Sequence, residues 1–318
     1  MLLPKLLFFA AIHKIMKIKS VSSFREPAKD LQYYEDWIKQ LESHNQLSYD
    51  RLEIKTSLGN TSIWGINTGN IGLPSLLIFP GFRTSTLFWD LDRALDDLRN
   101  DYRIFLVETN GQPNLSEGHT PYIRSTGYGI WANEVVEQLG LEKVSVAGAS
   151  FGSLVCLKLS IIAPEKIDKI ILLNPGCFQL FSPAFKNVWY NLLPIFSPSE
   201  KNVRAFLENI IFYKPNHQLS EEAEQLLIDY EIFVLKRFID KAQKPYPMSG
   251  KELRKIQNDT YLLLGDRDTL FPYKKSIAVA QKHLPALKKI YLLENTGHGI
   301  ETSKEAIAIM KNILSNTP

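Results

Sequence analysis

The fold is decided by the stretch KVSVAGASFG, residues 143–152, and by the apolar run SLVCLKLSIIA that follows it over residues 153–163. The β-branched residues predict a buried strand over 144–147, and the apolar run predicts a helix. Between them, Gly148, Ser150 and Gly152 form a G-x-S-x-G pattern, which is a weak signal by itself. Between a strand and a helix it indicates a tight turn that strains the serine backbone and exposes the hydroxyl. The simpler alternative is a turn whose serine caps the helix.

Other short β-branched and aliphatic segments recur along the chain with helical segments between them. They predict strands over 52–56, 62–67, 76–79, 104–107, 170–173, 261–264 and 290–293, with the first two forming a hairpin around Gly59 and Asn60. This alternation predicts an α/β fold with a mostly parallel, eight-stranded sheet flanked by helices. Each later strand is followed within three residues by Gly, Asn or Pro, and chemistry is expected at those carboxyl ends.

One interval breaks this rhythm. About 85 residues separate the strands that end at 173 and begin at 261, whereas a strand–helix–strand crossover needs about 30 residues in all. Because this interval is rich in aromatic residues, we predict a helical cap over 175–256, inserted into a core of residues 49–174 and 257–318. Residues 1–48 are predicted to form a helical extension.

A serine hydroxyl needs a base within hydrogen-bond reach, and the base needs an orienting partner. His298 is the only one of the six histidines that lies just beyond a buried strand between glycines. The expected acid is Asp268 or Asp266, both after the 261–264 strand, and Asp268 is preferred because it stands further past the strand end. Thirty residues separate Asp268 from His298, which leaves room for one helix between adjacent strands. The predicted catalytic set is therefore Ser150, Asp268 and His298.

A hydrolytic site also needs backbone amides to hold an oxyanion. One is expected from Phe151, directly after the nucleophile. The other is expected from Phe82, in the turn after the 76–79 strand, where Gly81 lets the chain bend. Of the other histidines, His119 could approach the site as a binding residue, and the rest lie in polar stretches where we expect them to be solvated.

These elements together resemble the α/β-hydrolase superfamily and, within it, the bacterial carboxylesterase-like branch. The resemblance covers residues 24–314, and its most telling stretches are LLIFPGFRTSTLFW, YRIFLVETNGQPNLSE, LGLEKVSVAGASFGS and APEKIDKIILLNP. It includes a G-x-x-D-x-x-x-P turn matched by Gly265, Asp268 and Pro272, which favours Asp268 over Asp266. The chain departs from relatives at Pro80, where they usually carry histidine, and at Asn174, where some carry an alternative acid.

The resemblance implies acyl transfer through Ser150 on a carboxylic ester, and the aromatic cap adds the expectation of a small or medium apolar ester. Thioesters, lactones, carbon–carbon bond hydrolysis and perhydrolysis use the same residues on the same fold, and a non-catalytic ligand-binding protein is a further alternative. Haloalkane dehalogenases and epoxide hydrolases resemble the fold too, but they use an aspartate where this chain has Ser150.

The bulk composition limits the partners. The net charge of +3 comes from 37 basic and 34 acidic side chains without long blocks of one sign, so no nucleic acid is expected. Cys156 and Cys177 lack the spacing of a metal site, and neither metal nor cofactor is predicted. The predicted partner is a small-molecule ester, and a homodimer stays open.

The first 20 residues are apolar with interspersed lysines. They could be a weak signal peptide or an interfacial amphipathic helix, but the apolar stretch over 6–12 is short and no A-x-A pattern follows. A helical extension packed on the domain is preferred. A bilayer span needs about 20 apolar residues, so we expect no stable membrane insertion and a cytoplasmic protein.

Overall fold

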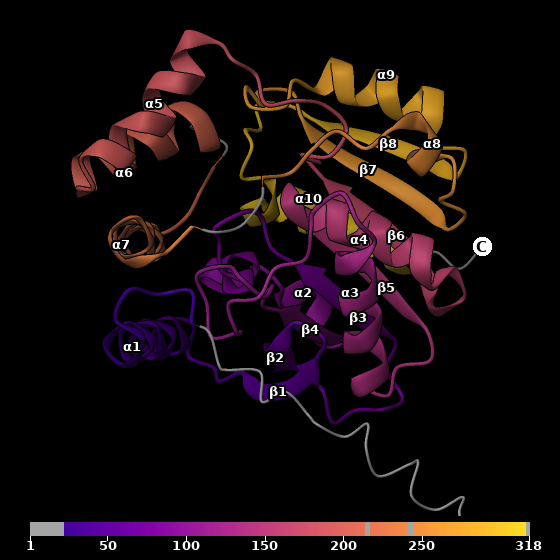
Figure 1. Ribbon diagram of the computed structural model, residues 1–318, viewed down its shortest axis with the longest axis horizontal. Coiled ribbons are helices and arrows are strands. Elements are labelled where there is room, and N and C mark those ends of the chain that lie inside the picture. The colour runs from indigo at the N-terminus through magenta and orange to yellow at the C-terminus, as the bar shows by residue number, and fades with distance from the viewer. Residues whose placement is uncertain (1–21, 214–216, 241–243, 316–318) are drawn as a thin grey trace, which may run out of the picture.

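The computed structural model describes residues 22–213, 217–240 and 244–315, and it contains one eight-stranded sheet (Figure 1). The order across the sheet is β1-β2-β4-β3-β5-β6-β7-β8. The β1–β2 and β2–β4 pairs are antiparallel, and β3 to β8 run parallel. The predicted fold class is confirmed. The strands are β1 (Asp50–Thr56), β2 (Gly59–Ile66), β3 (Ser75–Phe79), β4 (Arg103–Val107), β5 (Val144–Ala149), β6 (Ile167–Leu173), β7 (Asp259–Gly265) and β8 (Leu287–Leu293).

The first hairpin differs from the prediction in its turn. The two turn residues are Ser57 and Leu58, and Gly59 is already the first residue of β2, paired with Thr56. Gly59 has φ +110°, a conformation that strongly favours glycine. The glycine is therefore needed at the first position of β2, directly after the turn. The predicted turn at Gly59 and Asn60 lies two residues beyond the observed one.

Helices cover both faces of the sheet. The α-helices are α1 (Pro27–Asn45), α2 (Asp96–Arg99), α3 (Gly127–Gln138), α4 (Phe151–Ile162), α5 (Phe185–Phe196), α6 (Glu200–Phe206), α7 (Glu221–Arg237), α8 (Gly250–Leu253), α9 (Tyr273–His283) and α10 (Lys304–Ser315). Three short 3₁₀ segments, η1 (Thr86–Arg93), η2 (Pro164–Lys166) and η4 (Ile300–Thr302), and the π-helical turn η3 (Leu207–Ile211) complete the elements of the described residues.

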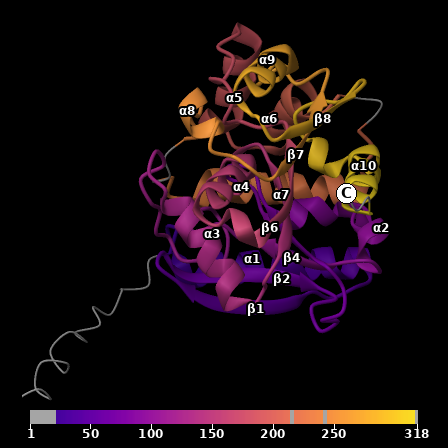
Figure 2. The same ribbon diagram turned by 90° about the vertical axis from the view of Figure 1, so that its right-hand side faces the viewer.

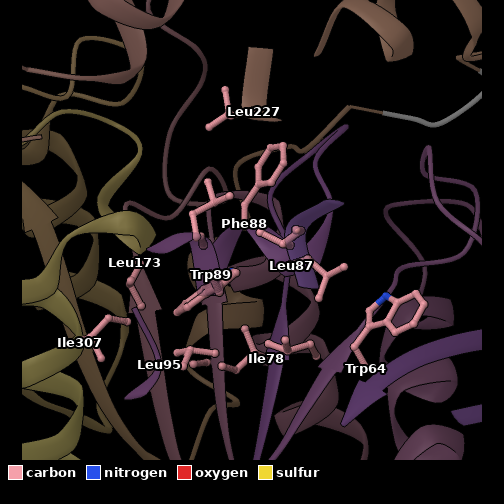
Figure 3. Close-up of a cluster of buried hydrophobic side chains, with 14 of the residues drawn as sticks. Trp64, Ile78, Leu87, Phe88, Trp89, Leu95, Leu173, Leu227 and Ile307 are labelled. Atoms are coloured by element: carbon pink, nitrogen blue, oxygen red, sulfur yellow. The ribbon is translucent and has the colours of Figure 1, made fainter. Parts of the chain in front are cut away.

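Alternate residues of each central strand enter two separate cores. In β3, Leu76 and Ile78 pack with residues of α1, η1, α7 and α10, whereas Leu77 and Phe79 pack with residues of α3, α4, α8 and α9. Figure 3 shows part of the first core, where Trp89 and Leu95 lie close to Ile78. Because both faces are buried, the central parallel strands are mostly apolar, which made them visible in the sequence, whereas the edge strand β8 exposes Lys288 and Lys289.

A buried hydrogen-bond network fastens α1 to the carboxyl end of β4. The carboxylate of Glu108 accepts hydrogen bonds from the Tyr34 hydroxyl at 2.7 Å, the Ser85 hydroxyl at 2.9 Å and the Trp64 indole at 3.2 Å. Burial raises the pKa of Glu108, although these donors oppose the shift. Since Ser85 follows the β3 turn, the network also fixes the loop that carries Phe82.

The long interval between β6 and β7 holds α5, α6, η3, α7 and α8 (Figure 2). The division into extension, core and inserted cap stays a prediction. The first 21 residues, and with them the expectations for the N-terminal segment, lie outside the described residues. In the part of the chain that the structure describes, no helix has the length and apolarity needed to cross a bilayer.

Candidate active site

The turn between β5 and α4 holds Ser150 in a strained conformation. Ser150 has φ 49° and ψ −105°, a region that side-chain-bearing residues rarely adopt. A Cβ on Gly148 would lie 2.3 Å from the carbonyl carbon of Gly152, and a Cβ on Gly152 would lie 2.2 Å from the Phe79 oxygen. Both glycines are therefore required by close backbone approach. The alternative of a simple cap is not what is found, because the Ser150 side chain makes no capping hydrogen bond to α4.

Asp268 and His298 meet at the carboxyl ends of β7 and β8. The Oδ2 atom of Asp268 lies 2.8 Å from Nδ1 of His298. The other carboxylate oxygen accepts hydrogen bonds from the amides of Leu270 at 2.9 Å and Phe271 at 3.0 Å. The Asp268 side chain is fully buried and the His298 side chain is 11 % exposed. This arrangement fixes the ring so that Nε2 is left for another partner.

Asp266 points elsewhere. Its Oδ1 accepts a hydrogen bond from the amide of Thr296 at 3.2 Å, and its Oδ2 lies 3.6 Å from Nε of Arg267. Asp266 thus ties the turn after β7 to the loop after β8. The contact to the histidine belongs to Asp268.

The charges around His298 favour its protonated form. Burial disfavours the imidazolium, but the charge and hydrogen bond of Asp268, helped by the charge of Glu301, outweigh this effect and raise the pKa of His298. Burial also raises the pKa of Glu301, and its Oε2 is a buried atom without a hydrogen-bond partner among the described residues. A histidine in this setting takes up a proton readily, as a general base must.

Asn174 fixes the loop after β8, which carries His298. At the end of β6, its Nδ2 donates to the carbonyl oxygens of Gly297 at 2.9 Å and His298 at 3.1 Å. Its Oδ1 accepts from the amide of Gly265 at 2.9 Å, at the end of β7. The same amide group therefore joins the ends of three neighbouring strands at the point where Asp268 and His298 emerge.

Small and apolar groups surround the Ser150 hydroxyl. A Cβ on Gly176 would lie 3.4 Å from the Ser150 Oγ and 3.3 Å from the Phe271 ring. The ring of Phe271 is 5.5 Å from the ring of His298, centroid to centroid. Gly176 therefore lies beside Ser150, and Phe271 lies beside both Gly176 and His298. Across the described residues, no hydrogen bond involves the Ser150 hydroxyl, and catalytic hydrogen bonds often tighten only when substrate binds.

The two predicted oxyanion donors lie on either side of Ser150. Phe151 is the first residue of α4, where an amide has no partner within its own helix. A Cβ on Gly81 would lie 3.9 Å from the Ser150 Cβ, which places the Phe82 loop beside the serine. The rings of Phe82 and Phe151 pack edge to face with centroids 6.1 Å apart. The next amide, that of Arg83, is already taken, because it donates to Gln112 at 2.8 Å.

Comparison with known proteins agrees with this architecture. A family model described as "alpha/beta hydrolase fold" matches residues 74–210, which span β3 to η3. The crystal structure of carboxylesterase CesB (YbfK) from Bacillus subtilis superimposes with a TM-score of 0.74 at 19 % identity, over 90 % of this chain and 98 % of that one. The chain has the α/β-hydrolase fold.

Two curated proteins are similar in sequence, and both come from Bacillus subtilis strain 168. An uncharacterized carboxylesterase, nap, is 24 % identical over 77 % of this chain and 79 % of its own length. Carboxylesterase YbfK is 21 % identical over 88 % of this chain and 92 % of its own length. The resemblance to bacterial carboxylesterases that the sequence indicated is confirmed.

Three residues of this candidate site were not predicted as site residues. Gly176 lies against the Ser150 hydroxyl, Asn174 holds the His298 loop, and Glu301 lends its charge to the histidine. The only signal for the first two was their position after the β6 strand. Glu301 had no signal, because a glutamate in a helix-like stretch is usually solvated.

The expectation of solvated histidines was wrong for His44. Its Nε2 lies 2.7 Å from Oδ1 of Asp92, between α1 and η1. The predicted binding residue His119 is partly buried, and its Nε2 has no hydrogen-bond partner in the described part of the chain. Within that same part, no group of three or more His, Cys, Asp or Glu side chains could hold a metal ion.

Proposed function

We propose that the protein is a serine hydrolase that cleaves carboxylic esters through an acyl-enzyme. The observation that carries this proposal is the 2.8 Å contact between Asp268 and His298, made at the sheet edge where Ser150 sits with φ 49°. A strained serine, a buried histidine and an orienting carboxylate are the groups that acyl transfer needs. The distant carboxylesterase relatives support the same class.

The reaction proceeds in two steps. The Ser150 oxygen attacks the ester carbonyl carbon, and its proton passes to Nε2 of His298. The tetrahedral oxyanion accepts hydrogen bonds from the amides of Phe82 and Phe151. The alcohol then leaves with the proton from His298. Water attacks the acyl-enzyme, gives a proton to His298, and releases the acid as the proton returns to Ser150.

The surroundings of Ser150 favour an apolar acyl or alcohol group. The partly exposed ring of Phe271 lies beside Gly176, which adds no side chain next to the Ser150 hydroxyl. The partly exposed ring of Phe82 packs against Phe151, the residue after the serine. Apolar walls with few polar groups are typical of small-molecule sites. Phe185 and Phe196 of α5 are each 81 % exposed, so the outward aromatic residues of the insertion do not supply this lining.

Turnover of p-nitrophenyl esters of graded acyl length tests both parts of the proposal. We expect hydrolysis that is lost in Ser150→Ala, with kcat/KM that rises from acetate to medium chains. A folded wild-type protein without turnover on the whole panel would contradict the esterase assignment. Equal kcat/KM at every chain length would contradict only the apolar site.

A further inference from the structure

The two faces of α5 are reversed relative to an ordinary surface helix. Its buried residues are Asn187 and Pro194. Asn187 donates from Nδ2 to the carbonyl oxygens of Thr269 at 2.6 Å and Ser182 at 3.3 Å, so a polar side chain makes the contact with the loop after β7. A surface helix normally turns its apolar stripe inward and its polar residues to solvent.

The apolar residues of α5 instead form one continuous outward stripe. Phe185 and Phe196 are 81 % exposed and Trp189 is 53 % exposed. With the exposed residues between them, they make up the α5 stripe: Phe185, Val188, Trp189, Leu192, Ile195 and Phe196. The spacing of three and four residues places them along one side of the helix. Leu180, 74 % exposed, and Phe181 extend this apolar surface just before the helix.

The only charged side chain within the segment that carries the α5 stripe is positive. Residues 177–199 contain one lysine, Lys186, and no aspartate or glutamate. A groove of about 610 Å³ beside Leu180 and Phe181 is completed by Lys275, which follows another lysine at the start of α9. A large exposed apolar surface marks an interaction site, and flanking lysines favour an anionic partner.

We propose that the α5 stripe docks the protein onto an anionic lipid–water interface. Aromatic and aliphatic side chains enter the boundary between head groups and acyl chains, while the lysines contact the anionic head groups. In both views α5 lies at the outer end of the molecule, on the side opposite β1 (Figures 1 and 2), so a flat surface can reach it. A second copy of the chain fits less well, because a two-fold contact would place this positively charged segment against the same segment of the copy, which holds no aspartate or glutamate over residues 177–199.

Docking at α5 would bring the interface close to the catalytic edge. Asn187 contacts the carbonyl of Thr269, the residue after Asp268, and the amide of Ser182 donates to Leu270 at 2.9 Å. The stripe is thus anchored on the loop that carries the proposed acid. The docking proposal stands independently of the proposed esterase activity, since it rests on exposure and charge.

Trp189 offers a direct readout of docking. It is the one exposed tryptophan, because the other four, Trp37, Trp64, Trp89 and Trp131, are at most 4 % exposed. The full chain is titrated with vesicles of phosphatidylcholine containing phosphatidylglycerol, and with vesicles of phosphatidylcholine alone. We expect a blue shift of the tryptophan emission and co-flotation with the anionic vesicles, and much weaker binding to the neutral ones.

Substitutions test whether the α5 stripe, and not another part of the surface, binds the vesicles. Phe185→Ser combined with Phe196→Ser should lower the partition coefficient about tenfold or more, and Lys186→Glu should weaken binding further on anionic vesicles. The matched control is Ile71→Ser. Ile71 is 84 % exposed, but it precedes β3 and so lies near the amino end of that strand, away from the carboxyl ends where Asp268 and His298 meet. An unchanged thermal midpoint shows that each variant is folded.

Three results would overturn the proposal. Vesicle binding by the double variant at the wild-type level would assign docking to another part of the chain. The absence of any emission shift on anionic vesicles would exclude contact at Trp189. A wild-type dimer that the double variant turns into a monomer, without vesicle binding by either, would make the α5 stripe a contact between copies.

Discussion

The side-chain amide of Asn174 donates a hydrogen bond to the backbone oxygen of His298 over 3.1 Å, and a second one to Gly297 over 2.9 Å. Asn174 itself has φ 40°, a conformation that asparagine tolerates better than most residues. The hydrogen bonds of the Asn174 side chain go to backbone groups, so its role is to position the loop that carries the histidine.

Asn174→Asp should therefore weaken the hold on the His298 loop, although aspartate and asparagine have side chains of the same shape. The two carbonyl oxygens would face a carboxylate oxygen instead of two N–H groups, which costs about 1–3 kcal/mol of unfolding free energy. We expect a lower kcat together with this loss, measured by ester hydrolysis and by denaturant unfolding. The same substitution at Asn202, whose amide bonds Ser197 at an exposed site, is the control and should change little. Equal changes of kcat and of unfolding free energy in the two variants would contradict the positioning role of Asn174.

Gly176 should be required for access to Ser150. A leucine there would place a side chain in the space beside the Ser150 Oγ, where a Cβ alone is at 3.4 Å. We expect Gly176→Leu to lower kcat/KM strongly for bulky esters and less for acetate. Gly69→Leu is the control, since nothing lies within 4 Å of its Cβ position. A Gly176→Leu enzyme with the wild-type preference for acyl length would show that the acyl group lies elsewhere.

The pH dependence follows from the raised pKa of His298. Because the neutral ring accepts the proton from Ser150, kcat/KM should fall as the pH drops through a value above the ordinary histidine pKa of about 6.5. Glu301→Gln removes a negative charge that raises this pKa, so the acidic limb should move to lower pH. Glu305→Gln, at an exposed position of α10, should leave the limb in place. An identical profile in all three proteins would contradict the coupling of Glu301 to the histidine.

The choice between the two aspartates can be tested with a matched pair. Asp268→Asn keeps the shape but no longer fixes the histidine tautomer, and by analogy with serine proteases turnover should drop by about 10⁴. Asp266→Asn retains an oxygen that can accept from Thr296, so turnover should stay near the wild-type level. Comparable losses in both variants would mean that the turn after β7, and not Asp268 alone, supports the reaction.

Much of this site could be predicted because its signals are local in sequence. Ser150 sits in a glycine pattern between a strand and a helix, and His298 stands between glycines past a buried strand. The choice of Asp268 over Asp266 rested partly on its position further past the strand end and partly on the family resemblance. The structure adds a physical reason, since the Asp266 carboxylate is occupied by Thr296 and Arg267.

What could not be predicted depends on contacts between distant segments. Asn174 and Glu301 act on His298 through space, and no spacing in the sequence marks such contacts. The hairpin turn lies two residues before its predicted place, because Gly59 belongs to β2 and not to the turn. The apolar periodicity of α5 is visible in the sequence, but periodicity does not say whether an apolar stripe faces the core or the solvent.

The central claim is that Ser150 is the nucleophile activated by His298. The most direct measurement is reaction with a fluorophosphonate, followed by mass spectrometry of the intact protein and of its peptides. We predict one adduct per chain, located on Ser150 and much slower to form in His298→Ala. A folded wild-type protein that stays unlabelled, or an adduct on another residue, would contradict the account.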